Sequence, residues 1–163
     1  MTTSTPILRT LLLVSDPLDA PILIVDDLHK LEATLGTVAA AAEFVVQIAE
    51  VEAVGSLLVR DPTPFTILHY LGHGTAVAAT QAGALVFEDR IGAARLLDPM
   101  ELLLTLNPTG ISTFRLALLS ACHSERVAQA FVAWGSCRNA TGHLYTCRYH
   151  SNSCPTAAAT SVG

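Results

Sequence analysis

The sequence predicts an α/β fold, a three-layer α/β/α sandwich in which helices cover both faces of a mostly parallel sheet. Short runs that are apolar on both faces have the composition of strands in such a sheet, and segments of helical period separate them. The chain has 163 residues, of which 51% are hydrophobic and 14% charged. This length is enough for one domain with a substantial core and too short for two ordinary domains.

Three strands are expected in the first half of the chain. They are Leu8–Ser15, Val45–Val51 and Phe65–Leu71. Between the first two, Asp26–Phe44 opens with two acidic residues and places leucines at helical spacing, so this segment predicts a helix. A short helix is expected at Glu52–Arg60, because the prolines in Asp61–Pro64 end it.

A small β-hairpin is predicted next, since a turn-forming cluster separates the apolar runs Ala84–Glu88 and Ala93–Leu97. Asp98 is a favourable N-cap residue and Pro99 suits the first position of a helix. We therefore expect a helix from Pro99 to about Leu106.

The fourth strand of the main sheet is expected at Phe114–Ser120, followed by a helix at Glu125–Trp134 that begins after Ser124. Beyond Gly135 the composition changes sharply and no periodicity remains. The sequence thus predicts one domain over residues 1–135 and an irregular tail over residues 136–163, which leaves an exposed sheet edge beside the fourth strand.

Charge and hydropathy exclude several classes of partner. The formal net charge is -5 and no basic cluster occurs, so nucleic acid is not an expected partner. No segment has the length of a membrane span or the pattern of a signal peptide, which predicts no membrane association and a cytoplasmic location. Cys122 stands in the apolar part of the chain and the other three cysteines crowd the tail, unlike a secreted disulfide framework.

Two short motifs follow the third and fourth predicted strands. They are Leu71-Gly72-His73-Gly74 and Ser120-Ala121-Cys122-His123-Ser124. Ligands of open parallel sheets bind beyond the carboxyl ends of strands, so adjacent strands would bring His73 and Cys122 to one edge. Cysteine is a nucleophile as its thiolate, and a nearby imidazole can take the proton. A histidine followed 49 residues later by a cysteine is the order of a caspase-type thiol protease.

The neighbours of the two residues favour the same chemistry. Gly72 and Gly74 are expected to leave room for substrate and to allow unusual backbone angles. The backbone amides of Gly74 and Cys122 are candidates for an oxyanion hole. Cys122 also lies just before the helix that begins at Ser124, and amide groups at a helix N-terminus favour a thiolate.

Other histidines offer alternative bases. His69 lies inside the third strand, four residues before His73, so we expect it to support the site together with Ser120 and not to act on substrate. His123 is expected to face away from its neighbour Cys122. The tail holds Cys137, His143, Cys147, His150 and Cys154, which have the residue types of a zinc site but no paired close spacing, so no metal is expected.

Four segments carry a family resemblance. They are Ile67–Gly74, Leu85–Asp89, Leu97–Leu102 and Leu118–Ser124. At these segments the chain resembles the CHAT domains, which belong to the clan of caspases, separases, gingipains and metacaspases. The resemblance implies a caspase-like fold and a cysteine peptidase that uses His73 as base and Cys122 as nucleophile on a protein or peptide substrate, without a cofactor. It also implies a bacterial setting with a partner protein or a helical-repeat module.

Two residues depart from the patterns of related enzymes. Glu125 stands where glycine often follows the Cys-His-Ser triplet, and Ser120 stands where metacaspase-like members carry an acidic residue that holds a basic substrate side chain. Specificity for arginine or lysine is therefore not implied. The tail does not resemble the strands that continue the family fold, so we expect the chain to be truncated or altered after Gly135.

Two other functions remain open. The same fold could serve as a catalytically inactive module that binds a partner protein. A flavodoxin-like domain that binds a nucleotide or phosphate is less favoured, because Ser15-Asp16-Pro17-Leu18 follows the first strand in place of a glycine-rich phosphate loop.

Overall fold

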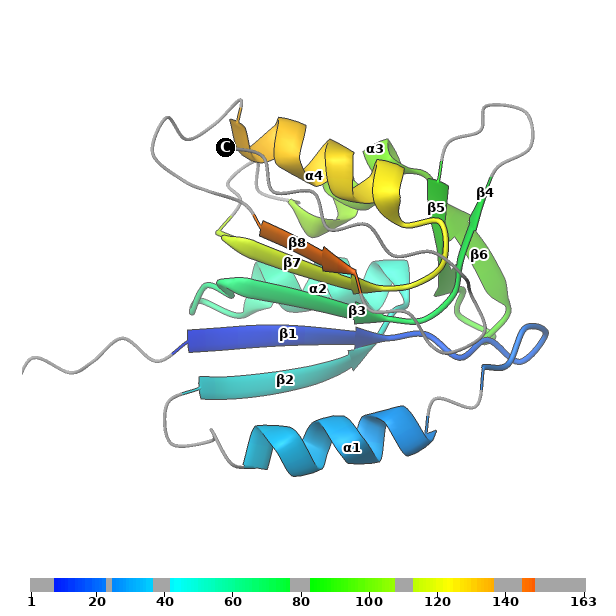
Figure 1. Cartoon of the computed structure of the whole chain (residues 1–163), viewed down its shortest axis with the longest axis horizontal. Coiled ribbons are helices and arrows are strands. Elements are labelled where there is room, and N and C mark those ends of the chain that lie inside the picture. The colour runs from blue at the N-terminus through cyan, green and yellow to red at the C-terminus, as the bar shows by residue number, and fades with distance from the viewer. Residues whose placement is uncertain are drawn as a thin grey trace, which may run out of the picture.

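The computed structural model describes residues 8–22, 25–36, 42–76, 83–107, 113–136 and 145–148, in which strands alternate with helices (Figure 1). The helices are α1 (Val25–Gly36), α2 (Val51–Arg60), α3 (Pro99–Leu106) and α4 (Glu125–Ser136). The strands are β1 (Leu8–Val14), β2 (Ala42–Ile48), β3 (Ile67–Leu71), β4 (Gly74–Ala76), β5 (Gly83–Glu88), β6 (Ala94–Leu97), β7 (Leu116–Ser120) and β8 (Tyr145–Arg148).

The larger sheet has the strand order β2-β1-β3-β7-β8, and every pairing in it is parallel. Strand β3 lies between β1 and β7, with Leu71 paired to Val14 on one side and to Ser120 on the other. Parallel strands need crossover connections, and here helices provide them. The predicted α/β class with a mostly parallel sheet flanked by helices is confirmed.

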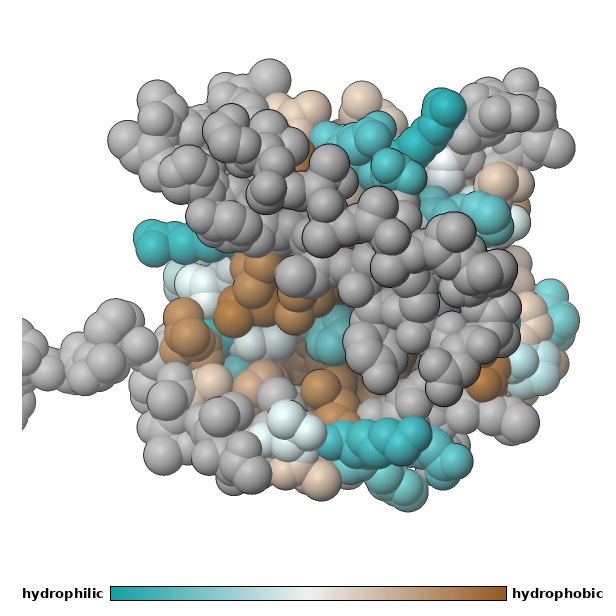
Figure 2. Space-filling model, viewed as in Figure 1, coloured by the Kyte–Doolittle hydropathy of each residue, from teal (hydrophilic) through white to brown (hydrophobic). Residues whose placement is uncertain are grey.

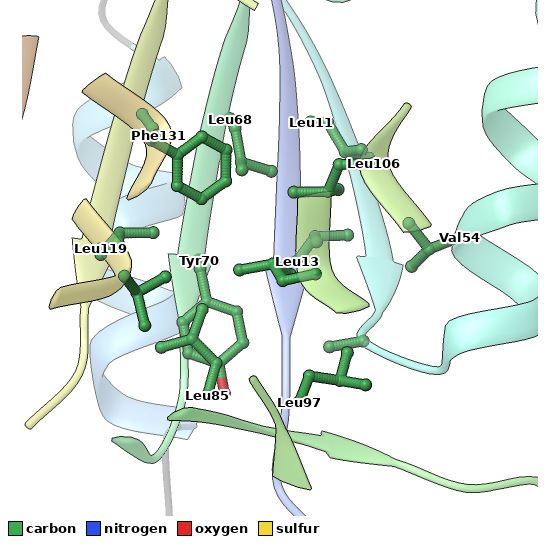
Figure 3. Close-up of a cluster of buried hydrophobic side chains, with 14 of the residues drawn as sticks. Leu11, Leu13, Val54, Leu68, Tyr70, Leu85, Leu97, Leu106, Leu119 and Phe131 are labelled. Atoms are coloured by element: carbon green, nitrogen blue, oxygen red, sulfur yellow. The ribbon is translucent and has the colours of Figure 1, made fainter. Parts of the chain in front are cut away.

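The hydrophobic core lies between one face of this sheet and helices α2, α3 and α4 (Figure 3). In β3 and β7 burial alternates along the strand, because successive side chains point to opposite faces of a sheet. The core residues include Leu11, Leu13, Val54, Leu68, Tyr70, Leu106, Leu119 and Phe131. On the other face Thr10 and Leu12 of β1 are also buried, whereas Val46 and Ile48 of the edge strand β2 are 56% and 57% exposed. Figure 2 shows apolar patches in the same view as Figure 1.

Strands β4, β5 and β6 form a separate antiparallel sheet at the carboxyl ends of the parallel strands (Figure 1). The pairing of β5 with β6 confirms the predicted hairpin, and Asp98 caps α3 as expected by accepting the backbone N–H groups of Met100 and Glu101. Strand β4 is an element that sequence analysis missed. It contains three residues with no apolar run, and pairing with β5 gives it its extended form.

The amino ends of the strands carry a charged cluster around the buried Arg9. Its guanidinium donates to Glu43 and to Asp61, at 2.8 and 2.9 Å, and lies 4.4 Å from the ring centroid of Phe65. Hydrogen bonds with Glu43 and then Asp61 raise the pKa of Arg9, and the same bonds lower the pKa of each carboxyl group. This cluster joins β1, β2 and the segment after α2. It lies at the amino ends of the strands, whereas both motifs follow the carboxyl ends.

Two predictions are wrong, one on the boundary between the first helix and the second strand and one on the tail. The helix expected over Asp26–Phe44 ends at Gly36, and the strand begins at Ala42, because parallel pairing with β1 outweighs the helix propensity of alanine there. Tyr145–Arg148, expected to be irregular, forms β8 on the edge of β7 that was expected to stay exposed. Tyrosine and threonine favour strands, and an unpaired edge offers a template for one. The tail outside β8 and beyond Ser136 lies outside the described residues.

Among the helices that the structure describes, none has both the length and the apolar character to cross a lipid bilayer.

Candidate active site

The histidine and cysteine motifs follow two neighbouring strands that end at paired residues. Leu71, the last residue of β3, pairs with Ser120, the last residue of β7. His73 and Cys122 each come two residues later in their strands' continuations. The Gly72 N–H group extends the contact between the two segments by donating to the carbonyl of Ser120 at 3.3 Å. The prediction that the two motifs share one edge of the sheet on adjacent strands is therefore confirmed.

Beyond the strand ends the two segments touch through their backbones. A Cβ atom placed on Gly74 would overlap the carbonyl oxygen of Cys122 and would lie 3.2 Å from the Cβ of Ala121. A Cβ atom on Gly83, which begins β5, would likewise overlap the carbonyl oxygen of His123. The small sheet thus packs directly on the cysteine turn, and glycine is needed at both points of close approach.

The turn after β7 is closed by its own residues. His123 adopts the left-handed conformation with a φ of 51°, and its side chain is exposed. The buried Ser124 donates its hydroxyl hydrogen to the carbonyl of Ala121 at 2.9 Å, and its carbonyl accepts the N–H of Ala128 as α4 begins. Cys122 is half-buried, so this turn holds the cysteine at a solvent-accessible edge directly before a helix.

The loop that carries His73 is held from two sides. The carbonyl oxygen of His73 accepts the Val86 N–H of β5 at 2.9 Å and the Tyr70 hydroxyl at 2.9 Å. Tyr70 lies in β3, and sequence analysis missed it because its hydroxyl partners depend on a strand that follows later in the chain. Figure 3 shows its ring in the core with the hydroxyl directed toward β5.

The structure brings His69 and Ser120 together. The Nε2 atom of His69 lies 3.1 Å from the hydroxyl oxygen of Ser120, across the boundary between β3 and β7. Burial lowers the pKa of His69, which favours the uncharged imidazole at neutral pH. A neutral imidazole offers one donor and one acceptor, so it can bond a serine hydroxyl in either tautomer.

One expectation about the glycines is wrong. Neither Gly72 nor Gly74 has a positive φ, and among the described residues only Gly92 of the β5–β6 turn is a glycine with one. The space beside them is also not left for substrate. The hydroxyl of Tyr70 fills the position beside Gly72, and the carbonyl of Cys122 fills the position beside Gly74. Both glycines are therefore packing residues.

A metal site finds no support among the described residues, where no three His, Cys, Asp or Glu side chains group in a way that could hold an ion. The tail residues Cys137, His143, His150 and Cys154 lie outside the described part of the chain, and of Cys147 only the place in β8 is described.

The family model of the CHAT domain matches residues 9–135. This range contains both motifs and ends within α4. No curated protein matches the chain.

Proposed function

The chain belongs to the CHAT domain family, and from this premise we propose that it is a caspase-like cysteine peptidase with His73 as general base and Cys122 as nucleophile. The observation that carries the proposal is the register of β3 and β7, which pairs Leu71 with Ser120 and so starts both motifs at one level. The backbone contact between Gly74 and Cys122 supports it further, because the two loops cannot drift apart without breaking this packing.

The chemistry requires no group beyond the chain, a peptide and water. His73 takes the proton of the Cys122 thiol, and the thiolate attacks the carbonyl carbon of the scissile peptide bond. The tetrahedral intermediate collapses as the C–N bond breaks, and His73 gives its proton to the leaving amine. A water molecule, deprotonated by His73, then hydrolyses the thioester to release the acid and restore the thiol.

The amides of Gly74 and Cys122 are the proposed donors to the oxyanion. Strand pairing supports the role of Gly74. Val86 donates its N–H to the carbonyl of His73, the residue directly before β4, so this bond lies one step outside the paired residues Gly74 and Leu85. Gly74 and Leu85 are then the adjacent non-hydrogen-bonded pair, whose N–H groups point away from the partner strand. The N–H group of Gly74 is therefore not used by β5.

The test is covalent labelling by peptidyl acyloxymethyl ketones, a probe class that captures a cysteine nucleophile after it recognises a peptide. A mixture with varied residues beside the reactive group removes the need to know the specificity. Trypsin cuts after Arg115 and Arg126, so the peptide Leu116–Arg126 reports Cys122 separately from the three tail cysteines. Labelling of this peptide that requires His73 supports the proposal, and labelling that is equal in His73→Ala contradicts it.

The alternative is a catalytically inactive CHAT domain that binds a partner protein, such as a helical-repeat module. The two apolar side chains Val46 and Ile48 of the edge strand β2, both more than half exposed, are the observation that favours it. The two functions give different results in a partner-binding assay and in the labelling experiment. An inactive module would bind its partner equally well after Cys122→Ala and would show no His73-dependent labelling.

A further inference from the structure

The hydroxyl group of Tyr70 connects the core of the protein with the loop that carries His73. It lies 2.9 Å from the carbonyl oxygen of His73 and 2.5 Å from the carbonyl oxygen of Val86. Val86 in turn donates its N–H to the same His73 carbonyl at 2.9 Å. The three groups form a closed set of contacts that joins β3, the histidine loop and β5.

The position of this hydroxyl is fixed by its surroundings. Tyr70 is 1% exposed, and its ring stacks on Phe87 with the ring centroids 5.7 Å apart. Gly72 leaves the space that the phenol oxygen occupies, since a Cβ atom there would overlap it. Burial raises the pKa of Tyr70, so the hydroxyl stays protonated and keeps donating at neutral pH.

We propose that Tyr70 is a positioning residue for His73, because its hydroxyl holds the His73 carbonyl and with it the backbone that carries the imidazole. This inference rests on the proposed function, in which His73 draws the proton from the Cys122 thiol. The single hydrogen of the Tyr70 hydroxyl is shared between the backbone carbonyls of His73 and Val86, so Tyr70 acts through the loop and not on the substrate.

The experiment measures the rate at which iodoacetamide alkylates Cys122 in the full chain, read on the tryptic peptide Leu116–Arg126. The rate at about pH 6 reports ionisation assisted by a neighbouring imidazole, and the rate at about pH 9 reports access to the sulfur. The informative quantity is the rate at the lower pH divided by the rate at the higher pH. It is compared for the natural sequence, Tyr70→Phe, His73→Ala and the double variant.

We expect Tyr70→Phe to lower this ratio about fivefold, less than His73→Ala does, because the imidazole is retained but held less firmly. In the His73→Ala background, Tyr70→Phe should change the ratio no further, since a residue that acts through His73 has nothing left to act on. A purely structural role for Tyr70 would instead lower both rates together, or change the ratio equally in both backgrounds.

Two further variants distinguish an effect on the position of His73 from an effect on the stability of the protein. Leu102→Ala removes a core side chain of α3 and should lower the melting temperature more than Tyr70→Phe while leaving the ratio unchanged. Gly72→Ala keeps the tyrosine but forces its hydroxyl out of place, so it should reproduce the effect of Tyr70→Phe. It also keeps the question answerable if Tyr70→Phe does not fold.

The outcomes for the two ideas are distinct. A ratio that does not depend on His73 overturns the proposed dyad, and with it the role of Tyr70. A ratio that depends on His73 but is unchanged in Tyr70→Phe and in Gly72→Ala leaves the dyad standing and overturns the positioning role.

Discussion

The Cα atom of Gly74 lies so close to the carbonyl oxygen of Cys122 that no side chain fits between them. The contact joins the two candidate loops through backbone atoms, which cannot rotate out of the way as a side chain can. It also links the two sheets, because Gly74 begins β4 and Cys122 follows β7.

Replacing Gly74 by alanine should therefore destabilise the protein and separate the loops. We expect a cost of about 1–3 kcal/mol, typical of overpacking against a rigid neighbour, and slower labelling of Cys122 by the peptidyl ketones. Gly55→Ala is the matched control, because Gly55 lies inside α2 with open space around its Cα. That variant should gain about 0.5–1 kcal/mol from helix propensity and label normally. Thermal melting of both proteins provides the comparison, and a harmless Gly74→Ala would contradict the close approach.

Replacing His73 and His123 in separate variants should show which of the two histidines is the base. His73→Ala should slow labelling about 10²- to 10⁴-fold, the usual contribution of general acid–base catalysis. His123→Asn should leave the rate close to normal. Asparagine tolerates the left-handed backbone of His123, so this control does not disturb the turn. If His123→Asn abolished labelling at unchanged melting temperature, His123 would be the base and His73 would not.

His69 should make stability depend on pH near neutrality. Burial lowers its pKa in the folded protein below the ordinary value of 6.5, so the unfolded chain binds the proton first as pH falls. The contribution of neutral His69 is complete above about pH 6.5 and is lost as pH falls from there toward the lower pKa of the folded state. His69→Gln should flatten the melting temperature between about pH 7 and pH 5. His29→Gln, at an exposed position of α1, should keep the slope of the natural sequence.

Arg9→Lys should lower stability without affecting the candidate active site. Lysine is a point charge and cannot repeat the planar fork that reaches Glu43 and Asp61 while lying over Phe65. The melting temperature should fall at pH 7, and labelling of Cys122 should be unchanged, since Arg9 lies at the opposite edge of the sheet. The loss should shrink in acid. The two carboxyl groups contribute above their ordinary pKa values of 4.5 and 3.8, and this contribution disappears as pH falls through their lowered values. A loss that stayed constant down to about pH 2 would argue against the ion pairs.

Local patterns were sufficient to predict β1, β3 and β7 of the main sheet and the N-cap of α3. Asp98 and Pro99 specify the start of α3 by their own side chains, and the apolar runs of β1, β3 and β7 require burial wherever they lie. Elements defined by a distant partner were not predictable in this way. Strand β4 exists through β5, and the weakly apolar β8 exists through the edge of β7.

The candidate site divides along the same line. His73 and Cys122 were identified as candidates from the sequence because their residue types and their places after strands carry chemical meaning. The contacts that hold them were not, since Tyr70 reads in the sequence as one more strand residue and the glycines read as space for a ligand. Only the fold, which brings Val86 and Cys122 against these residues, reveals their packing roles.

The crossover between β3 and β7 sets an order on events during synthesis. His73 leaves the ribosome 49 residues before Cys122, and the turn around the cysteine needs α4 to complete it. A growing chain therefore carries the proposed base for a long interval without the proposed nucleophile. The proposed dyad is assembled only when β7 has paired with β3, so the proposed peptidase activity requires a sheet that is nearly complete.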